Sequence, residues 1–281
     1  MAVAQRLGCE IVSADSRQIY RDIPIGTAAP NLAEMGGVTH HFVGTHALDQ
    51  AVSAAAYADE VLAMLPRLWE HNDYVILCGG SMLYIDAVTD GIARMPDVSE
   101  ATRSRVADIL ATQGREGALA VLETYDPDAP ASIDIANPRR IARALEIVMT
   151  TGLPLAQVHT GESASRPFKI FKVAIDMPRE QLFARINARV GSMMAAGLLD
   201  EARRVLPHRH LNSLNTVGYK ELFDYFDGAI DLDEALRRIA RNTRVYAKKQ
   251  LTWLARPSVR PSIWLKDANA DAVIALLNEK K

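Results

Sequence analysis

Short apolar runs alternate along the chain with longer stretches that have helical spacing. The apolar runs predict buried strands over Glu10–Asp15, Tyr74–Cys78, Phe168–Ile175 and Ser262–Leu265. The helical spacing predicts helices over Ala54–Trp69, Arg140–Met149, Arg179–Leu199 and Leu232–Leu254. Nearly continuous apolar strands separated by helices are typical of a parallel sheet covered on both faces. The pattern therefore predicts an α/β fold.

The gaps between the predicted strands hold more helix than simple crossovers need. A length of 281 residues suits one large α/β domain. We expect a single core over residues 1–281, with helical elaborations over about 92–165 and 177–256.

Composition narrows the class of protein. Hydrophobic residues make up 49% of the chain and charged residues 23%, as in an ordinary globular protein. The apolar runs are far shorter than the roughly 20 residues of a membrane span, and no secretory signal is recognisable. Two cysteines, Cys9 and Cys78, are too few for a disulfide framework and are expected to be buried. His40, His41 and His46 have no completing ligand at metal-site spacing, so we expect no protein-built metal site. These features together predict a cytoplasmic enzyme, and we expect it to be a monomer.

Charge is segregated along the chain, although the net charge is only −2. Residues 235–266 contain nine basic residues and no acidic one, whereas residues 97–134 contain eight acids and three arginines. One helical stripe in the basic stretch carries Arg237, Arg241, Arg244 and Lys248. Like charges stacked in this way repel, and a polyanion would offset the repulsion. The stripe therefore indicates a nucleic-acid partner.

One carboxylate stands at the end of a predicted strand. Asp15 opens the segment Asp15–Tyr20, and ligands of an open α/β sheet bind at the carboxyl ends of its strands. At that place Asp15 is a candidate to take a proton from a nucleophile or to hold a metal-bound water. The competing interpretation is that Asp15 and Ser16 cap the next element.

Two further motifs carry groups that suit an anion. The glycines of Cys78-Gly79-Gly80-Ser81 let backbone N–H groups approach a ligand, or else simply make a tight turn. Asn137 and Pro138 begin a predicted helix on which Arg139 and Arg143 lie one turn apart. That spacing suits a phosphate, or else belongs to a solvated helix face.

Taken together and in this order, the motifs resemble the tRNA dimethylallyltransferase family over essentially the whole chain. The matching segments are Asp15–Tyr20, Ile25–Pro30, His40–Phe42, Gly79–Tyr84, Asn137–Glu146, Thr216–Glu221 and Thr243–Trp253. No single motif is decisive, but the ordered set is specific.

The resemblance implies transfer of a dimethylallyl group from its diphosphate to the exocyclic amine of the adenosine 3′ of the anticodon in tRNA. It implies a general base at Asp15, a residue of the reaction channel at Ser81 and a diphosphate contact at Lys220. It also implies contacts with the anticodon loop from Asp15, Ser16, Arg17, Gln18, Arg103, Arg139, Arg140, Ile141, Ala142, Arg143, Thr243 and Arg244. Mg²⁺ is the expected counter-ion of dimethylallyl diphosphate.

The resemblance also implies the fold of a phosphate-loop NTPase, a nucleotide-binding α/β fold, with a helical insertion and a helical C-terminal region. The first strand of that fold leads into a loop of the form GxxxxGK[ST], which cradles phosphates. No Gly-Lys pair occurs in this sequence, so we expect the first strand and the loop to be missing. Because that strand lies inside the sheet, we expect its two neighbours to expose apolar edges.

Two other functions are compatible with the same residues. A nucleotide isopentenyltransferase or nucleoside kinase would share the fold and act on a small acceptor, but would need no long basic stripe. A non-catalytic tRNA-binding protein would keep salt-dependent RNA binding and form no product.

We expect the purified 281-residue chain to transfer little or no dimethylallyl group to tRNA, because its sequence has no phosphate-loop motif. The measurement is incorporation of the labelled group into total tRNA, with salt-dependent tRNA binding as the control for folded protein. Prenylation at the rate of an intact family member would contradict this expectation.

Overall fold

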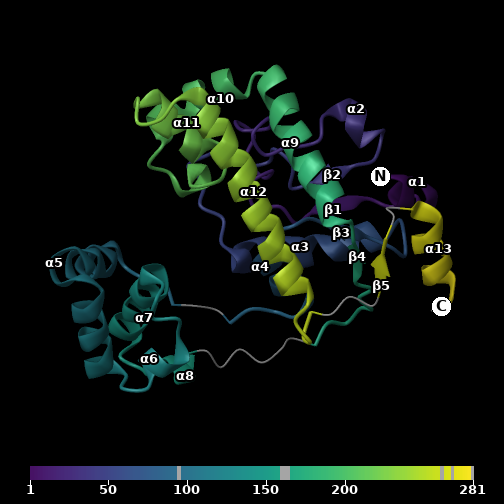
Figure 1. The fold of residues 1–281 in the computed structure, drawn as a ribbon. Helices are drawn as coiled ribbons and strands as arrows, with labels where there is room; N and C mark the ends of the chain where they lie inside the picture. The colour runs from purple at the N-terminus through teal and green to yellow at the C-terminus, as the bar shows by residue number, and fades with distance from the viewer. Residues whose placement is uncertain (94–95, 159–164, 260–262, 267–268, 280–281) are drawn as a thin grey trace. The chain divides into compact units, whose positions relative to one another are not determined.

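The computed structural model describes residues 1–93, 96–158, 165–259, 263–266 and 269–279. The chain forms two compact units (Figure 1). One unit is Met1–Thr89 with Arg166–Lys281, and the other is Asp90–Ser165. Each unit has its own cluster of buried apolar side chains.

The first unit contains a parallel sheet in the order β2-β1-β3. Its strands are β1 (Ile11–Ser13), β2 (His40–His41) and β3 (Ile76–Cys78). All three residues of β1 are buried, since this strand has a neighbour on each side. Strands β1 and β3 confirm two predicted strands. The sequence does not predict β2, because its two histidines carry no apolar signal.

Strands β4 (Val173–Ile175) and β5 (Ile263–Leu265) form a second parallel sheet and confirm the other two predicted strands. Among the described residues, β3 and β4 each pair along one edge only. Both strands carry exposed apolar side chains, at Cys78 and at Ile175, which is 56% exposed. The expectation that Cys78 is buried is therefore wrong, because β3 is an edge strand.

Helices make up most of the rest of the first unit. They are α1 (Ala2–Leu7), α2 (Leu32–Met35), α3 (Ala54–Trp69), α4 (Met82–Thr89), α9 (Arg179–Ala195), α10 (Leu198–Val205), α11 (Tyr219–Phe226), α12 (Leu232–Leu254) and α13 (Ala270–Glu279), with the 3₁₀ turns η1 (Leu206–His208) and η2 (Asn212–Leu214). Helix α3 begins where the Ser53 side chain accepts from the Ala56 N–H, and it buries Tyr57, Val61 and Leu65 on one face. Helices α1 and α13 lie side by side, joined by an ion pair between Arg6 and Asp271 (Figure 1).

One predicted helix is two helices. The sequence predicts a single helix over Arg179–Leu199, but α9 ends at Ala195 and α10 begins at Leu198. Gly197 between them has a φ of 99°, a left-handed conformation that glycine adopts without steric cost. The break lets α10 take its own direction, which places Glu201 in the interior.

The second unit consists of helices in its described part. They are α5 (Glu100–Tyr125), α6 (Ala129–Ser132), α7 (Pro138–Thr151) and α8 (Leu155–Val158). Helix α5 is interrupted at Gly114, where φ is 65°, and its second half packs Leu122 against Ile141 and Leu145 of α7. Over the whole described chain, no helix combines the length and apolar character of a membrane crossing.

Candidate active site

Strands β1 and β3 approach each other unusually closely where both end. The Ala14 N–H donates to the Cys78 carbonyl at 2.8 Å, and the Ser81 N–H donates to the Ala14 carbonyl at 3.0 Å. A Cβ on Gly79 would lie 2.3 Å from the carbonyl carbon and oxygen of Ala14. Only glycine fits that contact, so the diglycine is more than a flexible turn. The close approach brings Ser81 next to the segment that follows β1.

Ser81 and Ser16 are hydrogen-bonded through both hydroxyl groups. The Ser81 Oγ accepts from the Ser16 N–H at 2.8 Å and donates to the Ser16 Oγ at 3.0 Å. The side chain of Ser81 is buried. The structure therefore joins two predicted site residues, 65 positions apart in the chain, into one polar cluster.

Asp15 uses one of its carboxylate oxygens to shape the backbone. Its Oδ1 accepts from the N–H groups of Arg17 at 2.8 Å and Gln18 at 3.2 Å. Within the described part of the chain no donor bonds to Oδ2. The capping and proton-accepting interpretations of Asp15 are therefore compatible, because each needs a different oxygen.

Arg17 and Gln18 point their side chains at backbone carbonyls. The Arg17 Nη1 donates to the carbonyls of Asn212 and Ser213 at 2.9 and 3.0 Å. The Gln18 Nε2 donates to the carbonyls of Thr27 and Ala28 at 3.3 and 3.0 Å. Both side chains thus brace the Asp15 turn against neighbouring loops.

The basic helix α12 is fastened to the diglycine turn. The Gly80 carbonyl accepts from the Tyr246 hydroxyl at 3.2 Å and from the Gln250 Nε2 at 2.9 Å. One turn further on, the Trp253 Nε1 donates to Asp86 of α4 at 3.0 Å. Sequence reasoning missed Tyr246 and Gln250, although positions 246, 250 and 253 share one helical face.

Tyr246 connects α12 electrostatically to the acid. The pKa of its phenol is raised, first because the hydroxyl end is withdrawn from water and second because the charge of Asp15 is close. A hydrogen bond with Ser81 acts in the opposite direction. The residue as a whole is 40% exposed, so Tyr246 presents accessible surface beside the Asp15 cluster, which comprises Asp15, Ser16 and Ser81.

Part of the basic stripe is already paired. Glu234 accepts from Arg238 at 2.7 Å and forms an ion pair with Arg237 at 3.1 Å, and the hydrogen bond from Arg238 lowers the pKa of Glu234. Glu234 lies one residue before the acid-free segment 235–266. The charge composition of that segment therefore does not reveal that two of its arginines are paired. Among the described residues, no ion pair involves Arg241, Lys248 or Lys249, and these three remain available to a polyanion.

The two α12 residues predicted to contact tRNA have partners of their own. The Arg244 Nη1 donates to Asn187 Oδ1 at 3.0 Å, and its guanidinium lies 5.5 Å from the ring centre of Phe183. The Thr243 hydroxyl donates to the Ile239 carbonyl within the helix. Arg244 therefore fastens α12 to α9 as well as presenting charge.

Lys220 lies apart from the Asp15 cluster in its described contacts. It is exposed in the first turn of α11. It lines an open hollow of about 380 Å³ that lies between α11 and the segment containing η1 and η2. The other residues around this hollow are Arg209, His210, Leu211, Asn212, Leu214, Asn215, Phe223 and Asp224. Arg17 bonds to the Asn212 carbonyl, so the hollow borders the loop that braces the Asp15 turn.

The remaining predicted residues lie in the second unit. Arg139 and Arg140 are exposed at the start of α7, whereas Arg143 pairs with Glu146 at 3.0 Å. Arg103 of α5 forms an ion pair of 3.6 Å with Glu100, and Ala142 is half-buried. The side chain of Ile141 is fully buried in the core of this unit, so it is not available to RNA.

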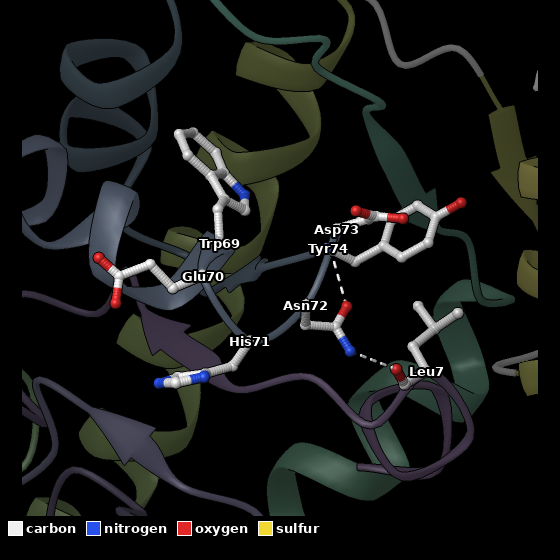
Figure 2. Close-up of a pocket in the computed structure, with 7 residues that line it drawn as sticks. All are labelled: Leu7, Trp69, Glu70, His71, Asn72, Asp73 and Tyr74. Atoms are coloured by element: carbon white, nitrogen blue, oxygen red, sulfur yellow. Dashed lines mark hydrogen bonds between the residues drawn. The ribbon is translucent and has the colours of Figure 1, made fainter.

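A second hollow lies at the opposite end of the sheet (Figure 2). It has a volume of about 400 Å³ and is formed by Leu7 and the residues Trp69, Glu70, His71, Asn72, Asp73 and Tyr74. These residues come before β1 and β3, whereas Asp15 and Ser81 come after them. Ligands of open α/β sheets bind at the carboxyl ends of strands, which favours the Asp15 cluster as the active site.

The metal chemistry of the site follows from its donors. In the described part of the chain, no group of three or more His, Cys, Asp or Glu side chains is arranged to hold a metal ion. The strand ends offer one carboxylate, Asp15, and the hydroxyls of Ser16 and Ser81. Mg²⁺ is commonly bound by one or two carboxylates together with substrate phosphates. The donor set fits a cation that enters with a phosphate substrate.

Comparisons with known proteins identify the family of the chain. Residues 18–257 match the IPP transferase family. Over 256 residues the chain is 51% identical to tRNA dimethylallyltransferase 2 of Porphyromonas gingivalis. The aligned region is 91% of this chain and 85% of the relative. Over 281 residues it is 44% identical to tRNA dimethylallyltransferase 2 of Parabacteroides distasonis. Here the aligned region is 100% of this chain and 93% of the relative.

Solved structures show the same architecture. The tRNA isopentenylpyrophosphate transferase of Bacillus halodurans is similar with a TM-score of 0.69 and 32% identity, over 99% of this chain and 89% of that chain. A eukaryotic dimethylallyltransferase acting on tRNA has a TM-score of 0.81 at 23% identity, over 99% of this chain and 74% of that chain. These likenesses confirm the predicted α/β fold of the phosphate-loop type.

Replacing Gly79 by alanine should destabilise the protein by about 1–3 kcal/mol or more, the usual cost of overpacking. The added Cβ meets the Ala14 backbone at 2.3 Å, which cannot move without shifting β1. Chemical denaturation measures the free energy of unfolding.

Gly80→Ala is the matched control for this substitution. Its Cβ meets the end of the Gln250 side chain, which can rotate away, so a smaller loss of stability is expected. Equal losses in the two variants would show that the strand contact is not special.

Proposed function

The chain belongs to the IPP transferase family, and from this premise we propose that it transfers a dimethylallyl group from dimethylallyl diphosphate to tRNA. The acceptor is the exocyclic amine of the adenosine 3′ of the anticodon. The observation that carries the proposal is the joining of Asp15, Ser81 and the basic helix α12 in one cluster. One such cluster offers both a proton acceptor and a surface for a polyanion.

Asp15 is the proposed general base. The amine nitrogen forms a bond to the allylic carbon while the carbon–oxygen bond to diphosphate breaks, and Asp15 Oδ2 takes the amine proton. Because Oδ1 is held by the N–H groups of Arg17 and Gln18, the carboxylate keeps its orientation during the transfer. Ser81 and Ser16 line the place where the two substrates meet.

The diphosphate needs compensation for the charge that develops as it leaves. Lys220 is the proposed cationic contact, since it is exposed and its hollow borders the loop that Arg17 braces. Mg²⁺ would enter bound to the diphosphate and would neutralise part of its charge. Asp15, Ser16 and Ser81 are the residues near which it would sit.

The affinity for tRNA comes in this proposal from phosphate contacts. Arg241, Lys248 and Lys249 of α12 supply it in the first unit, and Arg139 and Arg140 supply it in the second. Such contacts position RNA without reading its sequence. The target base leaves its stack in the loop and enters the site. Because the proposed acceptor is tRNA, we propose that the enzyme acts in the cytoplasm.

The alternative functions are less well supported. A small-molecule acceptor leaves the unpaired cations of α12 without a role. If the protein only bound tRNA, the free oxygen Oδ2 of Asp15 would have no role. The relatives at 51% and 44% identity are both named tRNA dimethylallyltransferase.

Asp15→Asn should lower the rate of prenyl transfer about 10²- to 10⁴-fold, the usual range for loss of a general base. Asparagine keeps an oxygen for the N–H groups of Arg17 and Gln18 but cannot take the proton. The rate is measured in a chain to which the strand and phosphate loop of an intact family member have been added, because the 281-residue chain itself is expected to transfer little or no dimethylallyl group. An unchanged rate would remove Asp15 from the mechanism.

Arg241→Glu should weaken tRNA binding and reduce the slope of log affinity against log salt by about 0.7–0.9, the value of one phosphate contact. Arg67→Glu changes the charge equally at an exposed position of α3 and should leave the slope unchanged. Binding is measured across a salt series. Equal effects of both variants would indicate that only net charge matters.

A further inference from the structure

Another carboxylate of the first unit, that of Glu201, is buried, and both of its oxygens accept hydrogen bonds. Glu201 of α10 is 1% exposed and accepts three hydrogen bonds. The donors are the N–H groups of Ile25 at 2.9 Å and Gly26 at 2.8 Å, and the Tyr219 hydroxyl at 2.6 Å. A buried carboxylate is tolerated only when it is hydrogen-bonded, and bonds to an ionised acceptor are the strong ones. Glu201 therefore fixes the segment Ile25–Ala28 to α10 and α11.

The residues around the Glu201 carboxylate are tightly packed. A Cβ on Gly26 would lie 2.3 Å from the Tyr219 hydroxyl, so the segment and the ring touch directly. Tyr219 is fully buried, and its pKa is raised first by burial and then by its hydrogen bond to Glu201. The phenol consequently stays protonated and remains a donor at neutral pH.

The clamped segment holds a strained backbone. Ala28 has a φ of +51°, a left-handed conformation that residues with a Cβ adopt only where their surroundings impose it. The carbonyls of Thr27 and Ala28 are the acceptors for the Gln18 side chain. Release of the segment would let Ala28 relax and would turn its carbonyl away from Gln18.

Gln18 completes a chain of contacts to the candidate base. Its N–H donates to Asp15 Oδ1, while its amide is held by the segment that Glu201 clamps. We propose that Glu201 and Tyr219 are positioning residues, which hold the Asp15 turn in the geometry that receives the acceptor base. They act through the Ile25–Ala28 segment and Gln18, without touching either substrate. This inference rests on the proposed transfer to an adenosine of tRNA.

The test uses the full chain and an anticodon stem–loop with 2-aminopurine in place of the target adenosine. This base has no amine at the reacting position, so no transfer occurs, and its fluorescence rises when it leaves the stack. Anisotropy of an end-labelled stem–loop gives the affinity. The 2-aminopurine signal at saturation gives the fraction of complexes in which the base has entered the site.

Glu201→Gln should reduce the unstacked population about tenfold, the effect of losing one hydrogen bond to a charged group. Glutamine offers one oxygen and turns its NH₂ towards a backbone N–H, which releases the segment. The affinity should stay within about twofold, because phosphate contacts from α12 supply it. Thermal melting verifies that the variant is folded.

Asp126→Asn is the matched control. Asp126 of the second unit is also buried, and it accepts from the N–H groups of Asp128 and Leu155. Its substitution should leave both RNA signals unchanged. An equal loss of the 2-aminopurine signal in this control would reduce the effect at Glu201 to general destabilisation and would overturn the proposal.

Tyr219→Phe gives an independent variant that keeps the buried ring and removes one of the three donors. It should reduce the unstacked population in the same direction but less than Glu201→Gln. It decides the question by itself if Glu201→Gln does not fold. In a Gln18→Ala background neither substitution should cause a further loss, because both act through Gln18.

The failures of the two proposals are distinguishable. Wild-type chain that binds the stem–loop without any rise in fluorescence would contradict the proposed function and this inference with it. A rise in wild type that is equally large in Glu201→Gln and Tyr219→Phe would overturn the positioning role alone.

Discussion

The contact between the backbones of Gly79 and Ala14 is the constraint on which the candidate active site depends. Without a side chain on Gly79, the ends of β1 and β3 come close enough for the Ser81 N–H to reach the Ala14 carbonyl. That bond delivers the Ser81 hydroxyl to Ser16, next to Asp15. A carboxylate and a diglycine from distant parts of the chain become one site because two strands touch where they end.

The same turn also sets the orientation of the basic helix. A carbonyl oxygen has two lone pairs, and Tyr246 and Gln250 use both of those on Gly80. The face of α12 that carries these residues is thereby directed inward, and Arg241 and Lys248 are exposed on another face. Attachment to the diglycine turn thus determines which cations of α12 face solvent.

Sequence reasoning succeeded where a signal is local. The four apolar strands, helix α12 and the placement of Asp15 after β1 all follow from periodicity and from where an apolar run ends. It failed where the signal depends on neighbours. The His40–His41 strand has no apolar pattern, Cys78 is exposed because β3 is an edge, and Glu234 lies just outside the basic segment that it partly neutralises.

Contacts across long separations in the chain were also out of reach. Helical spacing places Glu201 on the same face of α10 as Leu198, Ala202 and Val205, but its hydrogen-bond partners are not visible locally. Its fit depends on a glycine 175 residues away that leaves room for Tyr219. The helical spacing of positions 246, 250 and 253 was visible in the sequence, but not the carbonyl that two of them share.

Two acids of the first unit, Glu201 and Asp15, show how the surroundings of a carboxylate decide what it can do. Glu201 has both oxygens engaged by three donors and is shielded from solvent, so accepting a proton would break a hydrogen bond that water cannot replace. Asp15 has one oxygen engaged and is half-buried, so a proton can arrive at the other while the turn stays intact. A carboxylate with both oxygens hydrogen-bonded and shielded from water fixes structure, and one with a free oxygen can react. By this criterion the proposed roles of Glu201 and Asp15 are not interchangeable, even though both are carboxylates of the same compact unit.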